Sequence, residues 1–359
     1  MSRLRVLSFG SVPPEWGGGQ RGGVATFHAT LIESLRADGE CPVEIVGIVS
    51  HGPGEGPAPV PVRILQKGQR RAEFLRAVVD ELRPDVVLLN HFSTSWGLTL
   101  PTVAPELPLV GIAHSWHPIT QAQDPEVAHE RMQRAMDGLA ALVVPSLHCL
   151  REGRSLGLRY PERTHVVRYP LPRHFAEPLD VEQPRAGVVF AGELTARKNP
   201  AALLEAATSL PDLTLTIVGE GADRESLETM AVSRGIGARV RFAGSVDPET
   251  MRSVMSRAEV FCLASLSESF GIVYIEALAC GTPVIGFSPT LREIEAACGV
   301  ELGVGLPHAT KDEIVAAIEH VRARGWDRAG LRRAVVEAYA ASDIATDYAN
   351  VLVSAAGRA

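Results

Sequence analysis

Short apolar, β-branched stretches alternate along the chain with longer segments of helical periodicity. In the first half these stretches are "RVLSF" (5–9), "VEIVGIV" (43–49), "DVVLLN" (85–90), "PLVGIA" (108–113) and "ALVVPS" (141–146). The series starts again with "GVVFAGE" (187–193), "LTLTIVGEG" (213–221), "RVRFAG" (239–244), "AEVFCLAS" (258–265) and "TPVIGF" (282–287). Continuous apolar strands that alternate with helices are typical of parallel sheets covered by helices on both faces. The pattern therefore predicts two doubly wound α/β domains.

The segment 168–187, "RYPLPRHFAEPLDVEQPRAG", separates the two series. Its recurring prolines disfavour regular structure and predict a linker, with the domain boundary near residue 175. The glycine- and proline-rich segment 51–61 is expected to form a loop. Two doubly wound domains joined in this way are expected to leave a cleft at the carboxyl ends of their strands, where open α/β sheets bind ligands. Functional residues should therefore follow strands directly.

Composition agrees with a two-domain protein that remains in the cytoplasm. The chain has 359 residues and is 46% hydrophobic, which is more than one core usually takes up. The apolar stretch after Arg3 and Arg5 is too short for a signal peptide, and no run of about 18 apolar residues could cross a bilayer. The five cysteines are scattered without a C-x-x-C pair, so neither a disulfide framework nor a zinc site is indicated.

The charge distribution disfavours nucleic acid as a partner. The net charge is −7, and residues 1–170 carry 17 basic and 17 acidic side chains, so the acidic excess lies beyond residue 170. Binding of nucleic-acid phosphates requires a basic surface. The basic segment "KGQRRAEFLR" (67–76) is interpreted as the solvated side of an amphipathic helix, and docking to an anionic membrane or a phosphate is the alternative.

The segment "ESFGIVYIEALACGTPVI" (268–285) combines two glutamates with an apolar helix. It follows a predicted buried strand, and its apolar residues recur at helical spacing at Ile272, Ile275, Leu278 and Ala279. Gly281 is expected to end the helix and Pro283 to open the next strand. Glu268 then lies in the loop before the helix, and Glu276 lies in its early turns.

The start of this helix is a candidate phosphate site. Phe270, Gly271, Ile272 and Val273 offer free backbone N–H groups, and Gly271 lets the backbone approach a ligand closely. The carboxylates on either side can accept hydrogen bonds from hydroxyl groups that flank the phosphates. A nucleotide sugar carries hydroxyls on both its ribose and its sugar, so it fits this arrangement.

Glu268 and Glu276, with "SFGIVYI" between them, resemble the E-x7-E motif of retaining glycosyltransferases of the family 4 type, which have the two-domain GT-B fold. Further segments resemble that family in its order: "RGGVATFHATLIESL" (21–35), "LRPDVVLLNH" (82–91), "GIAHSWH" (111–117), "GELTARKNPAALLEAA" (192–207), "IVGEG" (217–221), "VRFAGSV" (240–246) and "SDIATDYANVL" (342–352). The resemblance implies two Rossmann-like domains facing a cleft. An acceptor-side domain would cover residues 1–174, a nucleotide-sugar-binding domain residues 175–340, and a terminal helix over 341–359 would pack back on the first domain.

The resemblance also implies roles for individual residues. Glu268 would bind hydroxyls of the donor sugar, Glu276 the ribose, and Lys198 would neutralise the departing diphosphate. His114 would face the sugar and donate a hydrogen bond to it or help to stabilise the reacting centre, and the catalytic residues would be His114, Glu268 and Lys198. The implied donor-binding residues are Gly22, Gly23, Arg197, Lys198, Ser245, Val246, Glu268, Ser269, Phe270, Gly271, Ile272, Val273 and Glu276.

Other readings of these residues stay open. Only three of the 35 basic residues are lysines, which favours a special role for Lys198 over a chance lysine at a helix start. A histidine after a strand is often structural, and Gly22 and Gly23 could form a flexible turn. The family commonly has an arginine after the glycine of the phosphate segment, but Glu193 follows Gly192 here. The second positive charge must then come from Arg197 or be missing.

The implied reaction needs no metal or other cofactor. The sequence contains no D-x-D pair for a metal-bound sugar diphosphate, and a helix N-terminus with Lys198 can supply the charge stabilisation instead. Retention of anomeric configuration is expected through front-face attack, in which the leaving phosphate assists deprotonation of the acceptor. Domain closure would exclude water. A double displacement with Glu268 as nucleophile is the alternative.

We therefore predict a retaining hexosyltransferase that moves a sugar from a nucleoside-diphosphate sugar, with uracil as the expected base, to a hydroxyl of a small polar or glycan acceptor. A lipid-linked acceptor is disfavoured by the neutral first domain. A nonhydrolysing nucleotide-sugar epimerase and a non-catalytic nucleotide-sugar-binding subunit remain as alternatives. A nicotinamide-dependent oxidoreductase is disfavoured because "GGGQRG" (17–22) does not follow its strand directly.

Overall fold

The computed structural model describes residues 2–19, 22–50, 56–92, 95–180 and 183–358. The chain divides into two compact units, of which the first comprises Met1–Pro170 with Ala340–Ala359 and the second comprises Leu171–Tyr339. Residues 51–55 of the expected loop, 181–182 of the expected linker and 20–21 of the glycine-rich segment lie outside the described residues.

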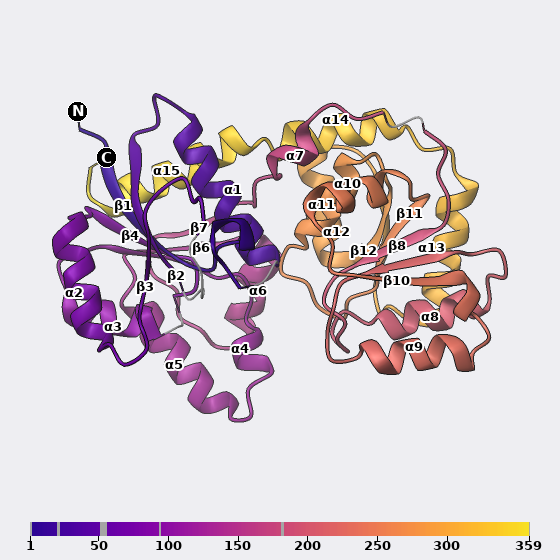
Figure 1. Ribbon diagram of the computed structural model, residues 1–359, viewed down its shortest axis with the longest axis horizontal. Helices are drawn as coiled ribbons and strands as arrows, with labels where there is room; N and C mark the ends of the chain where they lie inside the picture. The colour runs from indigo at the N-terminus through magenta and orange to yellow at the C-terminus, as the bar shows by residue number, and fades with distance from the viewer. Residues whose placement is uncertain (1, 20–21, 51–55, 93–94, 181–182, 359) are drawn as a thin grey trace. The chain divides into compact units, whose positions relative to one another are not determined.

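The described residues of the first unit form a seven-stranded parallel sheet with the order β3-β2-β1-β4-β5-β6-β7. The strands are β1 Leu4–Phe9, β2 Val43–Ser50, β3 Val62–Ile64, β4 Val86–Leu89, β5 Leu109–Ile112, β6 Ala141–Val144 and β7 Thr164–Val166. The helices are η1 Pro14–Trp16, α1 Gly23–Ala37, α2 Arg71–Leu82, α3 Ser95–Val103, α4 His117–Thr120, α5 Pro125–Asp137, α6 Leu147–Ser155 and α15 Ala341–Ala355. Helices α1 and α15 lie on one face of the sheet, and α2, α3 and α5 lie on the other (Figure 1).

The second unit repeats this architecture with a six-stranded parallel sheet in its described residues, in the order β10-β9-β8-β11-β12-β13. Its strands are β8 Val188–Ala191, β9 Leu215–Val218, β10 Val240–Gly244, β11 Val260–Leu263, β12 Val284–Phe287 and β13 Gly303–Leu306. Its helices are α7 Arg173–Ala176, α8 Pro200–Thr208, α9 Arg224–Ser233, η2 Gly237–Arg239, α10 Pro248–Ser256, α11 Ile272–Ala279, α12 Ser288–Cys298, α13 Lys311–Ala323 and α14 Arg328–Ala338. Helices α8 and α9 cover one face, and α10, α11, α12 and α14 cover the other (Figure 1).

The central strands are buried along their whole length, which explains their unbroken apolar sequences. Every residue of β4, β5, β6, β8 and β11 is buried, as expected for parallel strands with helices on both faces. In the first unit the core between the sheet and α2 and α3 is aromatic, because the ring of Trp96 lies 5.9 Å from the rings of both Phe9 and Phe74. The predicted fold class, two Rossmann-like α/β domains, is confirmed.

The strand order reverses once in each sheet. In the first sheet the chain runs outward from β1 to β3 and then returns to place β4 on the other side of β1. In the second sheet β11 lies beside β8 in the same way. At such switch points the connections leave in opposite directions, which keeps the carboxyl ends of the two central strands accessible to ligands. Loops that follow β1, β4, β8 and β11 are therefore the places where functional side chains can gather.

Two expectations about regular structure were incomplete. All ten predicted strands are present, but β3, β7 and β13 were missed; each lies at a sheet edge and lacks a continuous buried apolar run. The linker was expected to be irregular, whereas Arg173–Ala176 form the short helix α7. Pro172 precedes this helix, a position where proline is tolerated because the first N–H groups of a helix need no partner within it. The guanidinium group of Arg332 also binds carbonyl oxygens of this segment, including that of Phe175 at 2.9 Å.

Helix α15 completes the first unit. It packs against α1 and the sheet, and Tyr348 in its middle is fully buried, with its ring 5.8 Å from that of Phe27. Among the described helices, none combines the length and apolar character that crossing a membrane requires.

We expect Tyr348→Ala to destabilise the first unit by about 3 to 5 kcal/mol, because removal of a buried aromatic ring leaves a cavity between α15 and α1. Tyr348→Phe should cost little, because the Tyr348 hydroxyl has no hydrogen-bond partner among the described residues. Chemical unfolding monitored separately for each unit would check this. Equal losses for both variants, or a loss confined to the second unit, would contradict the assignment.

Candidate functional site

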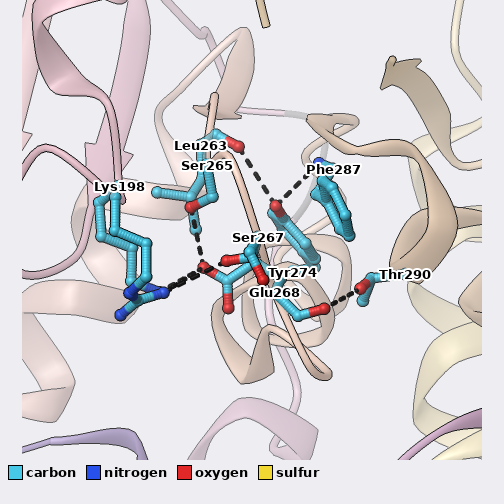
Figure 2. A network of polar contacts seen from close by, with 9 residues as sticks. Lys198, Leu263, Ser265, Ser267, Glu268, Tyr274, Phe287 and Thr290 are labelled. Carbon is cyan, nitrogen blue, oxygen red and sulfur yellow. Dashed lines mark hydrogen bonds and ion pairs between the residues drawn. The ribbon is translucent and has the colours of Figure 1, made fainter. Parts of the chain in front are cut away.

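Glu268 lies in the loop that follows β11 and is buried, with 6% of its surface exposed. The Ser265 hydroxyl donates to its Oε1 at 2.8 Å, and the Thr290 hydroxyl donates to its main-chain oxygen at 2.9 Å. Figure 2 shows both contacts. Glu268 is therefore held at the carboxyl end of the sheet, its carboxylate by Ser265 of the same loop and its main chain by Thr290 of α12.

Two cations from the loop after β8 meet this carboxylate. The Lys198 ammonium is paired with Oε1 of Glu268, toward which it points in Figure 2, and the Arg197 guanidinium lies 3.7 Å from the same oxygen. Arg197 also donates to the Ser267 carbonyl at 3.2 Å. The side chains of Glu268, Lys198 and Arg197 are only 8, 15 and 22% exposed. Two positive charges therefore face one negative charge, and an anion would find a net positive site at this switch point.

Gly271 and Tyr274 shape the turn into α11. Gly271 has φ of 72°, in the left-handed region, and a Cβ atom there would come within 2.6 Å of the Tyr274 ring. The buried Tyr274 hydroxyl donates to the Leu263 carbonyl at 3.2 Å and accepts from the Phe287 N–H at 3.0 Å (Figure 2). Tyr274 thus ties α11 to the ends of β11 and β12, and only glycine fits beside it.

Glu276 lies just over one turn into α11 and is 7% exposed. Burial alone raises the pKa of its carboxyl group to about 7. The predicted helix and its end are confirmed, because α11 covers Ile272–Ala279 and Gly281 adopts φ of 70°. Glu276 therefore changes charge near neutral pH, and strongly shifted pKa values are found in clusters at functional sites.

The other predicted residues at the start of α11 lie close to Glu268 in the chain, but most of them are buried. Ser269, Phe270 and Ile272 are buried at the helix start, and Val273 is half-buried. The ring of Phe270 packs edge-on against that of Tyr339, at a centroid distance of 5.8 Å. Much of the predicted helix start is therefore engaged in packing.

Ser245 and Val246 are separate from the Glu268 cluster. They follow β10, which lies at the sheet edge with β9 and β8 between it and β11. Strands are about 4.8 Å apart, so this edge lies roughly 10 Å from β8. Glu193 is exposed after β8. A ligand that touched both Lys198 and Ser245 would have to extend along the carboxyl edge of the sheet.

The predicted residues of the first unit lie at the carboxyl ends of its strands or at a helix start. Gly22 precedes α1 and Gly23 is its first residue, and both are exposed. A Cβ atom on Gly22 would meet nothing within 4 Å, and its φ of −176° is ordinary extended backbone. The fold itself therefore does not require glycine at position 22.

His114 follows β5, and both of its ring nitrogens have partners within the unit. Nε2 lies 2.9 Å from Oδ1 of Asn90, and Nδ1 is hydrogen-bonded to the Tyr169 hydroxyl. Burial and the neighbouring His91 hold the pKa of His114 well below its usual range. The predicted hydrogen bond from this ring to a sugar would require one of these partners to be exchanged.

Sequence reasoning missed Ser265, Tyr274 and Thr290 in the second unit and Asn90 and Tyr169 in the first. Each is a single polar residue inside or beside an apolar run, so no spacing pattern marks it. Among the described residues, no group of three or more histidine, cysteine, aspartate or glutamate side chains is arranged to hold a metal ion.

The segment that contains this cluster also has recognisable relatives. Residues 175–325 match the family model of glycosyl transferases, group 1. A D-inositol 3-phosphate glycosyltransferase from Mycobacteroides abscessus is 36% identical over 178 residues, 48% of this chain and 39% of that protein. The lipopolysaccharide core biosynthesis glycosyltransferase LpsE of Rhizobium meliloti is 32% identical over 155 residues, 42% of this chain and 45% of that protein. The chain spans about half the length of the curated relatives it matches.

Solved structures resemble the whole chain. Anabaena Alr3699/HepE in complex with UDP and glucose has a TM-score of 0.76 at 17% identity, covering 98% of this chain and 100% of that one. The pneumococcal O-GlcNAc transferase GtfA in complex with UDP and GlcNAc has a TM-score of 0.75 at 13% identity, covering 98% and 99%. At such identities the likeness shows the fold, which is GT-B.

We expect Glu276→Gln to become more stable relative to the wild type as the pH rises. The folded protein holds the Glu276 proton up to about pH 7, whereas the unfolded chain loses it near 4.5. Stability therefore falls between these pH values in the wild type and not in the variant. A shift of this size corresponds to about 2 to 3 kcal/mol at pH 8 relative to pH 4.5.

Unfolding of the second unit by urea at pH 5 and pH 8 would measure this difference. Glu225→Gln, which changes an exposed glutamate on α9, is the control and should show no comparable dependence on pH. A constant difference between Glu276→Gln and the wild type at both pH values would contradict the raised pKa.

Proposed function

We propose that the protein is a retaining, metal-independent glycosyltransferase that transfers a sugar from a nucleoside-diphosphate sugar, a UDP-sugar by preference, to a hydroxyl group of an acceptor. The observation that carries this proposal is the cluster of the buried Glu268 and the half-buried Arg197 and Lys198 at the switch point of the second sheet. The cluster lies inside the segment that matches glycosyl transferases, group 1. It offers positive charge for a diphosphate beside a carboxylate for hydroxyl groups.

Donor binding would redistribute the contacts of this cluster. The diphosphate takes Lys198 and Arg197 as partners, and the released Glu268 carboxylate accepts hydrogen bonds from the donor sugar. Glu276 accepts from the ribose, and the backbone N–H groups at the start of α11 contribute to the phosphate site. Ser245 and Val246 lie at the sheet edge where an extended nucleotide would end, which supports a base site there.

In the reaction, negative charge develops on the diphosphate as the bond to the sugar breaks. A fixed ammonium group in a site that excludes water stabilises that charge without reorganisation, so Lys198 is the principal catalytic cation. A phosphate oxygen of the leaving group takes the proton of the attacking hydroxyl. The Ser265 hydroxyl, which donates to Oε1 of Glu268, supports this front-face route, because it reduces the charge available for nucleophilic attack by the carboxylate.

The acceptor is a small polar molecule bound by the first unit. The names of the relatives, which include D-inositol 3-phosphate glycosyltransferases, support a cyclitol or sugar. The reported matches name glycosyltransferases, so the epimerase reading is not favoured. A non-catalytic binding subunit remains the second candidate because Glu193 stands where the family commonly has an arginine, and absence of transfer from every donor that binds would identify it.

We expect saturating UDP, without metal, to raise the unfolding midpoint of the second unit by several degrees, while GDP, ADP and NAD have smaller effects. A ligand at about a hundred times its dissociation constant adds roughly 2.7 kcal/mol to stability. Glu276→Gln should weaken UDP binding about tenfold or more if the carboxylate binds ribose hydroxyls. A shift with NAD alone, or with no nucleoside diphosphate, would refute the proposed donor site.

We also expect Glu268→Gln to bind UDP more tightly than the wild type while it loses sugar transfer. In the free protein Glu268 competes with a diphosphate for Lys198 and Arg197, so its neutralisation should tighten UDP binding by roughly tenfold. Isothermal titration calorimetry measures this directly. Glu225→Gln makes the same change of charge at an exposed position and should leave the affinity unchanged. Weaker binding by Glu268→Gln would mean that the carboxylate contacts UDP itself.

A further inference from the structure

Three polar side chains of the first unit form a continuous hydrogen-bonded chain. The Tyr169 hydroxyl contacts Nδ1 of His114, and Nε2 of His114 lies 2.9 Å from Oδ1 of Asn90. The imidazole is also enclosed by rings, since Phe27 packs edge-on against it at 5.3 Å and 72°, and the ring of His91 lies 5.2 Å away. His114 therefore has little freedom to rotate.

The partners determine where the imidazole carries its proton. The Asn90 amide is placed with its carbonyl oxygen toward Nε2 of His114. A carbonyl oxygen can only accept, so in this arrangement Nε2 donates to it. Nδ1 then accepts from Tyr169, whose hydroxyl keeps its proton because burial raises its pKa well above the usual value. This pattern fits a neutral imidazole with its proton on Nε2 and does not fit an imidazolium, which would have to donate from both nitrogens.

The surroundings of the ring also disfavour a positive charge. The titratable groups that face it are His91 after β4, His28 on α1, Tyr169 after β7, and Tyr348 of α15 beyond Phe27. Of the groups that shift the pKa of His114 in the described part of the chain, none is a carboxylate. Among the residues that the structure describes, no neighbouring charge therefore compensates an imidazolium at this position.

In its orientation toward His114, the Asn90 side chain leaves one buried donor, its Nδ2, without a hydrogen-bond partner among the described residues. Asn90 is fully buried directly after β4, and its backbone N–H is bound to the Phe9 carbonyl at 2.8 Å. Its Nδ2 lies close to Gly10, where a Cβ atom would come within 2.8 Å of it. A buried donor without a partner destabilises the fold, so an apolar side chain at this position would be more favourable for stability. The hydrogen bond between the amide oxygen and His114 is the contact that explains an amide at this position.

We propose that Asn90 and Tyr169 are positioning residues that hold His114 as a neutral imidazole, protonated on Nε2, for sugar transfer. The inference rests on the proposed function together with the role that the family resemblance implies for His114, which is to face the sugar. Positive charge develops at the anomeric centre when a glycosidic bond breaks. A neutral imidazole next to the anomeric centre does not oppose this positive charge, whereas a positively charged imidazolium would destabilise it by electrostatic repulsion.

Nitrogen-15 labelling of the histidines in the full chain tests the first half of this inference without a substrate. Two-bond proton–nitrogen correlation spectra distinguish the two neutral tautomers and the imidazolium, and His114→Asn assigns the signal. We expect the Nε2-protonated form in the wild type at neutral and mildly acidic pH, because burial and His91 hold the pKa of His114 well below its usual range. In Asn90→Asp, an isosteric carboxylate accepts from Nε2 and stabilises the imidazolium, so the pKa of His114 should rise by at least one unit. Wild-type His114 protonated on Nδ1, or an unchanged pKa in Asn90→Asp, would overturn the proposal.

The pH profile of sugar transfer tests the second half. Asn90→Asp should move the acidic limb of the kcat profile upward together with the pKa of His114, with little change in the KM for donor. Tyr169→Phe removes the hydroxyl that donates to Nδ1, and we expect a mixture of tautomers and a severalfold loss of kcat. Gln133→Glu, at another buried amide of this unit, is the control and should leave the His114 signal unchanged. A kcat profile that does not follow the His114 pKa would also overturn the proposal.

The two hypotheses can fail separately. If no nucleotide sugar were turned over, the proposed function would fail, while the nitrogen spectra would still show whether Asn90 and Tyr169 set the tautomer. If transfer occurred with normal profiles in Asn90→Asp and Tyr169→Phe, the proposed function would stand and the positioning role would be refuted.

Discussion

The pairing of Glu268 with Lys198 is the interaction on which the rest of the second unit's site depends. Both side chains are largely withdrawn from water, and a buried charge without a partner is strongly unfavourable. The pair forms only where two loops with opposite charges end beside each other. The reversal of strand order between β8 and β11 supplies that place, and Ser265, Thr290 and Tyr274 then fix the loop around the carboxylate.

The first unit uses the same topology with different chemistry. Its residues after β4 and β5 gather uncharged groups, Asn90 and a neutral His114, where the second unit gathers ions. Ions in the second unit suit a ligand that carries charge. Neutral donors and acceptors in the first unit suit an uncharged ligand that is recognised through its hydroxyl groups. The two clusters therefore match the distinction that the proposed function makes between a phosphate-bearing donor and a polar acceptor.

The sequence predicted the buried strands correctly and missed strands that are partly exposed. Strands with two covered faces produce long apolar runs, and all of these were found, whereas the edge strands β3, β7 and β13 escaped detection because solvent or glycine interrupts their pattern. The helix α7 escaped for a different reason. Arg332, which lies far along the chain, binds the carbonyl groups of this helix, and local propensity carries no trace of that contact.

The sequence by itself determined the two parallel α/β units, the helix that carries Glu276 and the loop that carries Glu268, because hydrophobic periodicity and chain-breaking residues act over short distances. Only the tertiary structure decided that Lys198 neutralises Glu268, that burial raises the pKa of Glu276, and that Asn90 and Tyr169 occupy both nitrogens of His114. These properties depend on distances between residues far apart in the chain and on the removal of water from around them. Both the distances and the exclusion of water are set only when the sheets have formed.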